Sequence, residues 1–125
     1  MINRESFKLS IAIPCYNEKK TIEAILKKVI KSLNDYKFLN YEIIIVDDHS
    51  KDGTTELLKN LTIDEKIKTF FHESNLGKGA AIHTALKHIT GDITIIQDAD
   101  LEYDPFDYNK LLIPFFETNA DVVYG

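Results

Sequence analysis

Short apolar runs rich in β-branched residues alternate along this chain with segments whose apolar residues recur at helical spacing. The first pair is a strand at Leu9 to Ile13 and a helix that places Ile22, Ile25, Leu26, Val29, Ile30 and Leu33 on one face. Strands that alternate with helices over short connections run parallel and are joined by right-handed crossovers. The alternation therefore predicts an α/β fold, an open and mostly parallel sheet with helices on both faces.

The same alternation continues along the rest of the chain. Further strands are predicted at Tyr41 to Val46, Ile67 to Phe71, Ile93 to Ile96 and Asp121 to Tyr124. Helices are predicted at Thr54 to Leu61, around Ile82, Ala85, Leu86 and Ile89 with Gly91 as the end signal, and from Asp104 with a kink at Pro114. No repeat or linker-like stretch interrupts the pattern, so we expect a single domain over residues 1–125.

Composition and charge exclude several classes of protein. The 125 residues are 44% hydrophobic and 28% charged, as in a globular domain rather than a disordered chain. The formal net charge of -5 disfavours nucleic acid as the main partner, because binding a phosphate backbone calls for a basic surface. The single cysteine, Cys15, excludes an internal disulfide and is interpreted as a small apolar residue at a strand end.

Membrane signals are weak in this sequence. No apolar run approaches the roughly 20 residues that cross a bilayer, and the first residues contain no signal-peptide core. We therefore expect a cytoplasmic chain. Several lysines crowd the first helix: Lys19, Lys20, Lys27, Lys28 and Lys31. They favour a solvated face, with peripheral association at the cytoplasmic face of a membrane as the alternative.

Polar clusters follow four of the predicted strands. They are Pro14 to Glu18, Asp47 to Gly53, Asn75 to Gly79 and Asp98 to Glu102. Ligands of open parallel sheets bind outside the carboxyl ends of the strands, near a switch in strand order. We therefore expect the four clusters to converge on one edge of the sheet and to form a binding site there.

The cluster with the clearest chemistry contains Asp98 and Asp100. Side chains two positions apart on an extended segment point the same way, so two carboxylates are brought together. A hard divalent cation, Mg²⁺ or Mn²⁺, relieves their repulsion and binds through carboxylates and the phosphate oxygens of a substrate. Glu102 is a candidate third ligand. The structural alternative is a pair of caps ahead of the helix at Asp104.

The other clusters allow more than one interpretation. In Asp47-Asp48, one carboxylate can accept from a nucleobase or ribose while the other caps the following loop, and Asp52 to Thr54 is typical of a turn that enters a helix. Gly77 and Gly79 allow a close approach or a sharp turn, but they form neither a Walker loop nor a dinucleotide fingerprint. The four histidines show no metal-ligand spacing and are interpreted as solvated or core residues.

Four segments together carry a resemblance. They are Ile11 to Glu18, Ile45 to Thr54, Gly77 to Ala81 and Asp98 to Pro105. In this order and spacing they resemble the N-terminal part of family 2 glycosyltransferases, most closely the polyprenyl-phosphate (dolichol-phosphate) mannose and glucose synthases. The resemblance implies a GT-A fold and an inverting, metal-dependent transfer of a hexose to a polyprenyl or dolichyl phosphate. The implied donor is a nucleoside-diphosphate sugar of the GDP-mannose or UDP-glucose type.

The resemblance also assigns site residues by position. The nucleoside would be held by Pro14, Tyr16, Glu18, Val46 and Asp48, and the diphosphate with its Mg²⁺ or Mn²⁺ by Asp98, Ala99, Asp100 and Glu102. Asp98 and Asp100 would be the catalytic pair. Two positions depart from the family pattern, His49 where a small residue is usual and Glu102 where the mannose synthases often have Gln.

Family members continue beyond the strand that matches Asp121 to Gly125 into an acceptor half. We therefore expect a sugar-nucleotide-binding half truncated before that part, which binds the donor without transferring sugar by itself and tends to self-associate. One alternative is a non-catalytic nucleotide-sugar-binding fragment. Another is a phosphoacceptor receiver module, which Val46-Asp47-Asp48 and Asp98 imitate. A whole strand and helix precede the acidic pair, and no lysine follows a further strand, which argues against a receiver.

Overall fold

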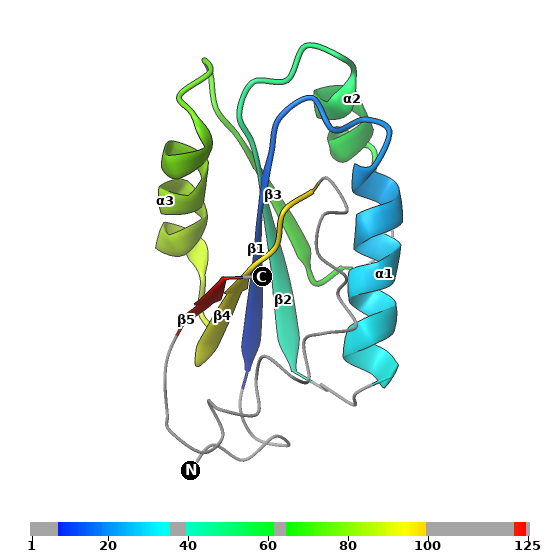
Figure 1. Cartoon of the computed structure of the whole chain (residues 1–125), viewed down its shortest axis with the longest axis vertical. Coiled ribbons are helices and arrows are strands. Elements are labelled where there is room, and N and C mark those ends of the chain that lie inside the picture. Colours follow the sequence, from blue (N-terminus) through cyan, green and yellow to red (C-terminus); the bar gives the residue numbers. More distant parts are fainter. Residues whose placement is uncertain (1–7, 36–39, 62–64, 100–121, 125) are drawn as a thin grey trace.

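A computed structural model of the chain describes residues 8–35, 40–61, 65–99 and 122–124. Its strands are β1 (Leu9–Cys15), β2 (Tyr41–Asp47), β3 (Ile67–Phe71), β4 (Ile93–Ile96) and β5 (Val122–Tyr124). Its helices are α1 (Ile22–Asp35), α2 (Thr54–Lys59) and α3 (Lys78–His88). The strands form one sheet in the order β3-β2-β1-β4-β5, and every neighbouring pair is parallel. The predicted α/β class with an open parallel sheet is confirmed (Figure 1).

Strand β1 lies at the centre of the sheet, and all seven of its residues are buried. Because side chains alternate along a strand, Leu9, Ile11 and Ile13 point to one face and Ala12 to the other. The first face packs against α1 and Leu58 of α2. The second face packs against Ala81 and Ala85 of α3. Helices therefore cover both faces, as the sequence predicts, and Figure 1 shows α1 and α3 on opposite sides of the sheet.

The predicted element boundaries differ from the structure by only a few residues. Strands β3 and β4 span the predicted residues, whereas β1 and β2 continue to Cys15 and Asp47. Helix α2 stops at Lys59 instead of Leu61. Strand β5 is confirmed from Val122 onward. The helix expected from Asp104 lies outside the described residues.

The predicted third helix is confirmed as α3, and the structure defines its buried face. Its buried residues are Ala81 and Ala85, while Ile82 is half-buried and Leu86 is 37% exposed. Small side chains occupy the centre of the buried stripe, and Ile82 and Ile89 pack against the same cluster.

The end of α3 also differs from the prediction, because Gly91 does not terminate the helix. The helix ends at His88, and Ile89 is already extended with φ −75° and ψ 146°. A Cβ at Gly91 would overlap Ser10 Oγ and come within 2.9 Å of the Lys8 carbonyl oxygen. The absence of a side chain at Gly91 therefore allows the segment before β4 to lie close against the start of β1.

No helix within the described parts of the chain is long and apolar enough to cross a membrane.

A buried carboxylate, Glu42, joins the amino ends of the strands. It accepts hydrogen bonds from Ser10 Oγ (2.8 Å), Thr90 N (2.5 Å) and Thr90 Oγ1 (3.1 Å). The Nζ atoms of Lys8 and Lys68 lie 3.5 and 3.6 Å from Glu42 Oε1. Burial acts to raise the pKa of Glu42, but the donors and Lys8 outweigh it, so the pKa is lowered. The ionised carboxylate links β1, β2, β3 and the segment before β4.

We expect Glu42→Gln to lower the free energy of unfolding at pH 7 by about 1–3 kcal/mol, because buried donors lose a charged acceptor. The pKa of Glu42 is lower in the folded chain. Its contribution is therefore full above the ordinary glutamate pKa of about 4.3 and is lost as the pH falls through the folded-state value. Urea unfolding at pH 7 and near pH 3 measures both effects. A wild-type advantage of the same size at both pH values would contradict an ionised Glu42.

The matched control is Asp35→Asn. Asp35 pairs with Lys31 at 2.6 Å, but its side chain is 47% exposed. Removing this pair should change the unfolding free energy by less than about 0.5 kcal/mol, as is usual for exposed helical pairs.

Candidate functional site

The sheet opens between β1 and β4 at the carboxyl ends of these strands. Strand β1 pairs with β2 as far as Cys15 and Asp47, but with β4 only as far as Ala12 and Ile96. The strands part before Pro14, which has no N–H to offer a neighbouring strand. The chain order also reverses here, because β2 and β3 lie on one side of β1 and β4 and β5 on the other. Such a reversal is where open α/β sheets bind ligands.

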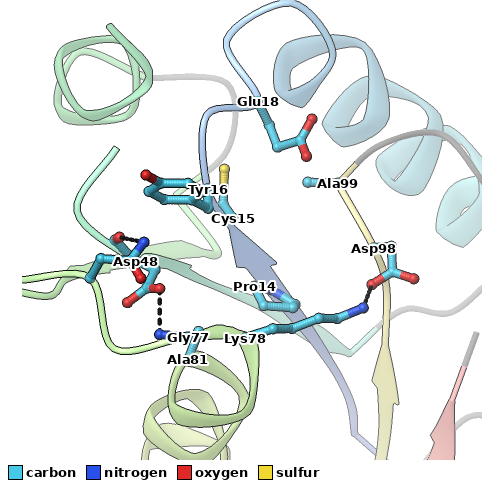
Figure 2. Close-up of a pocket in the computed structure, with 11 residues that line it drawn as sticks. Pro14, Cys15, Tyr16, Glu18, Asp48, Gly77, Lys78, Ala81, Asp98 and Ala99 are labelled. Atoms are coloured by element: carbon cyan, nitrogen blue, oxygen red, sulfur yellow. Dashed lines mark hydrogen bonds and ion pairs between the residues drawn. The ribbon is translucent and has the colours of Figure 1, made fainter. Parts of the chain in front are cut away.

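A pocket of about 390 Å³ occupies this opening. It is lined by Pro14, Cys15, Tyr16, Glu18, Asp48, Asn75, Gly77, Lys78, Ala81, Asp98 and Ala99. Every one of the four polar clusters contributes residues to it, so the expected convergence on one edge of the sheet is found (Figure 2). Its volume lies in the range of small-molecule sites.

Hydrogen bonds between the loops fix the walls of the pocket. The Asn17 amide N donates to Ser50 Oγ (2.9 Å), and the Lys51 amide N donates to Asn17 Oδ1 (2.8 Å). On the opposite wall, the Thr21 hydroxyl lies 3.0 Å from Glu18 Oε2 and donates to the Ala99 carbonyl oxygen at 2.7 Å. The loop after β1 is thus joined to the segments that follow β2 and β4.

Asp47 and Asp48 are adjacent, but their carboxylates have different hydrogen-bond partners and different roles. Asp47 accepts from Ser50 Oγ (2.5 Å) and from the Thr55 hydroxyl, and it does not line the pocket. It is the loop cap that the sequence predicts for one member of the pair.

Asp48 lines the pocket and holds the loop that follows β3. Its Oδ1 accepts from His72 Nδ1 (2.7 Å) and the Leu76 amide N (2.9 Å), and its Oδ2 accepts from the Gly77 amide N (2.8 Å). Burial acts to raise the pKa of Asp48, but these three donors outweigh burial and lower the pKa. Asp48 is therefore an ionised acceptor at neutral pH.

A charge pair marks the other end of the pocket. Lys78 Nζ lies 2.5 Å from Asp98 Oδ1, and Asp98 is only 7% exposed. Gly77 makes this possible, because its φ of 100° is a conformation that side chains rarely adopt and it starts α3 with Lys78 as the first residue. Figure 2 shows the Lys78 side chain running across the pocket from Gly77 to Asp98.

The structure brings together most of the predicted site residues that it describes. Those that line the pocket are Pro14, Tyr16, Glu18, Asp48, Asp98 and Ala99. Val46 is placed differently, since it shares its face of β2 with Ile44 and is fully buried against Ala81 and Ala85 of α3. Asp100 and Glu102 lie outside the described residues. Among the described residues, no group of three or more His, Cys, Asp and Glu side chains could hold a metal ion.

Two polar residues of the site have roles that sequence reasoning missed. His72 is neither solvated nor in an apolar core, since its ring lies between Asp48 and Thr84 Oγ1, the latter 2.8 Å from Nε2. Lys78 was recognised only as part of a cluster. The available signals were a histidine placed directly after a strand and a lysine at the same edge as several carboxylates.

Cys15 is the one thiol of the chain and lies at the base of the pocket, 2% exposed. Burial, with the nearby carboxylates of Asp47 and Glu18, raises its pKa well above the usual thiol range. A thiol kept protonated is a poor nucleophile.

We therefore expect Cys15 to react with iodoacetamide at pH 8 at least about tenfold more slowly in the folded chain than in the urea-unfolded chain. Mass spectrometry of quenched samples measures both rates, and free cysteine serves as the reference. Equal rates in folded and unfolded chain would contradict the burial of this thiol.

Comparison with known proteins agrees with this geometry. Residues 10–125 match Glycosyl transferase family 2. A dolichol-phosphate mannosyltransferase of Pyrococcus furiosus is 32% identical over 118 residues, which are 94% of this chain and 32% of that protein. The chain spans between 32% and 38% of the length of the curated relatives it matches.

Two of the solved structures that are similar to the chain were determined with a nucleotide sugar. The mannosyltransferase PcManGT from Pyrobaculum calidifontis, in complex with GDP-Man and Mn²⁺, has a TM-score of 0.68 and 30% identity, over 79% of this chain and 29% of that one. S. aureus TarS 1-349, in complex with UDP-GlcNAc, has a TM-score of 0.71 and 27% identity, over 88% of this chain and 31% of that one. The structural neighbours share the GT-A fold that the resemblance implies.

Proposed function

The chain belongs to glycosyl transferase family 2, and from this premise we propose that its pocket binds the nucleoside diphosphate part of a sugar donor. One observation carries the proposal. A single pocket holds an aromatic ring and a carboxylate acceptor at one end, Tyr16 and Asp48, and a lysine with a second carboxylate at the other, Lys78 and Asp98 (Figure 2). These are groups suited to a base and to a diphosphate. A receiver module has no support from the family match.

The end with Tyr16 and Asp48 is the proposed base site. The ring of Tyr16 is 41% exposed and can stack on a nucleobase. Asp48 is an acceptor and would pair with a ring N–H of the base. Guanine and uracil carry such a donor, whereas adenine and cytosine present an acceptor at the corresponding position and would leave the carboxylate unpaired.

The other end of the pocket requires an additional cation before it can hold a diphosphate. Among the described residues, the lining includes the carboxylates of Glu18, Asp48 and Asp98 and a single lysine, Lys78. A diphosphate would add further negative charge, so Mg²⁺ or Mn²⁺ is the proposed counter-ion. Asp98 fits this role, since it already attracts the Lys78 ammonium into the pocket. Asp100 and Glu102 are its proposed partners from the sequence, and PcManGT was solved with Mn²⁺.

The proposed reaction is transfer of a hexose from a GDP- or UDP-sugar to a polyprenyl phosphate of the dolichyl type. An oxygen of the acceptor phosphate would form a bond to the anomeric carbon, with inversion, while the bond from that carbon to the nucleoside diphosphate breaks. A divalent cation would neutralise the charge on the departing diphosphate. Within residues 1–125 we assign only the donor side of this reaction, with Asp98 and Asp100 as its catalytic residues.

A polyprenyl-phosphate acceptor would place the reaction at the cytoplasmic face of a membrane. Lys27 and Lys28 are exposed on α1 and would be attracted to anionic head groups there.

We expect GDP or UDP to bind the chain at least about tenfold more tightly with Mn²⁺ than with a chelator, because the carboxylates otherwise repel the diphosphate. Asp98→Asn should weaken the metal-dependent binding by one to two orders of magnitude, roughly 1.4–2.8 kcal/mol. Isothermal titration calorimetry measures both, with Asp35→Asn on the far end of α1 as the control. Equal affinity with and without chelator would refute the metal assignment.

We further expect Lys78→Met to act in opposite directions on the metal and on the nucleotide. Without nucleotide, Mn²⁺ should bind about two- to fivefold more tightly, because the ammonium no longer competes for Asp98 and this ion pair is half-exposed. With Mn²⁺ saturating, the nucleotide should bind more weakly, since a positive charge beside the diphosphate is lost.

Electron paramagnetic resonance of free Mn²⁺ measures the metal affinity, and calorimetry measures the nucleotide affinity. Lys87→Met, at an exposed lysine of the same helix, is the matched control. A change of both affinities in the same direction would contradict an exchange of Lys78 between Asp98 and the diphosphate.

A further inference from the structure

The carboxylate of Asp48 has little acceptor capacity left for a ligand. An ionised carboxylate offers about four lone-pair sites, two on each oxygen. Oδ1 accepts from His72 Nδ1 and the Leu76 amide, and Oδ2 accepts from the Gly77 amide. One site remains, and it belongs to Oδ2.

His72 is held in a way that keeps Oδ1 occupied. Because Asp48 is ionised and can only accept, Nδ1 of His72 must carry the proton of their 2.7 Å hydrogen bond. On the other side of the ring, Nε2 lies 2.8 Å from the hydroxyl of Thr84 on α3. The side chains of His72 and Asp48 are 9% and 4% exposed, so water does not compete freely for these bonds.

Uracil and guanine present different edges to such a carboxylate. Uracil offers one ring N–H between two carbonyl groups. Guanine offers a ring N–H next to an exocyclic amino group, two adjacent donors that a carboxylate with both oxygens available can accept together. A carboxylate with a single open site can accept the one ring N–H of uracil but leaves one guanine donor without its partner, and an unpaired buried donor is unfavourable.

We propose that His72 is a specificity-determining residue that, by occupying Asp48 Oδ1, makes the pocket select uracil over guanine nucleotides. The inference rests on the proposed nucleotide site and narrows its donor to a UDP-sugar. The similar solved structures do not decide this question, since one holds GDP-Man and another UDP-GlcNAc. His72 positions Asp48 and is not itself placed against the base.

Two substitutions test separately the two hydrogen bonds of the His72 ring, to Asp48 and to Thr84. The amide of His72→Asn reaches the position of Nδ1 and can still donate to Asp48, but it loses Thr84. The amide of His72→Gln reaches the position of Nε2 and can keep Thr84, but it leaves Asp48 Oδ1 with an open site. His83→Gln, at an exposed histidine one position before Thr84, is the matched control.

The measurement is the ratio of the dissociation constants of GDP and UDP, by calorimetry of the whole chain at saturating Mn²⁺. We expect a ratio of about ten for the wild type, for His83→Gln and for His72→Asn, the factor that one hydrogen bond of ordinary strength provides. For His72→Gln the ratio should fall to about two or less. A purely structural role for His72 would lower both affinities together and leave the ratio unchanged.

The outcomes distinguish the two proposals. If the wild type binds UDP and GDP equally, or if His72→Gln keeps the wild-type ratio, the role of His72 is wrong and the nucleotide site stands. If the wild type binds neither nucleotide, the proposed function itself is wrong. Should His72→Gln fail to fold, the wild-type ratio still decides, together with long-range ¹H–¹⁵N correlation spectra, in which a His72 Nδ1 without a proton would overturn the inference.

Discussion

The fully buried central strand β1 is the constraint on which the rest of the structure depends. Its neighbours β2 and β4 lie on opposite sides, and helices cover both of its faces. Ligands of such sheets bind beyond the carboxyl ends of the strands, and there β1 separates from β4 after Ala12 and continues through Pro14 beside β2. The reversal of strand order then directs four loops to that end. The pocket is therefore a consequence of topology, and the loops supply its chemistry.

Two buried carboxylates lie at opposite ends of β2, Glu42 within its first residues and Asp48 directly after its last, and they differ in their partners. Glu42 accepts three hydrogen bonds and has two lysines within 4 Å, all from other segments of the fold. Asp48, at the opposite end, also accepts three hydrogen bonds, but no lysine within the described residues pairs with it, and it lines the pocket. A buried charge is tolerated only when it is paired. Glu42, with its two lysines, serves stability, and Asp48 is placed to meet a ligand.

Much of the fold follows from the sequence, because the strands and helices of a doubly wound sheet have strong local patterns. The residues of β3 and β4 were predicted without error, and six of the site residues fall in one pocket. Local pattern does not predict a residue's role when that role depends on a contact with a distant segment. Gly91 is an example, because it lies close against Ser10 of β1. The same holds for the partners of His72 and Lys78, which lie 24 and 20 positions away in the chain. Val46 does not line the pocket, because motif position does not determine which face of a strand a side chain takes.

Two consecutive residues connect the two ends of the pocket. The Gly77 amide donates to Asp48 at the proposed base end, and the Lys78 side chain reaches Asp98 at the proposed diphosphate end. Gly77 precedes α3 and Lys78 is its first residue, so the backbone contact with Asp48 and the side-chain contact with Asp98 start from adjacent positions. A displacement of Asp48 would act on the Gly77 amide, and thus on the backbone from which the Lys78 side chain extends. The backbone between Gly77 and Lys78 is therefore a direct structural link between the proposed base end and the proposed diphosphate end of the pocket.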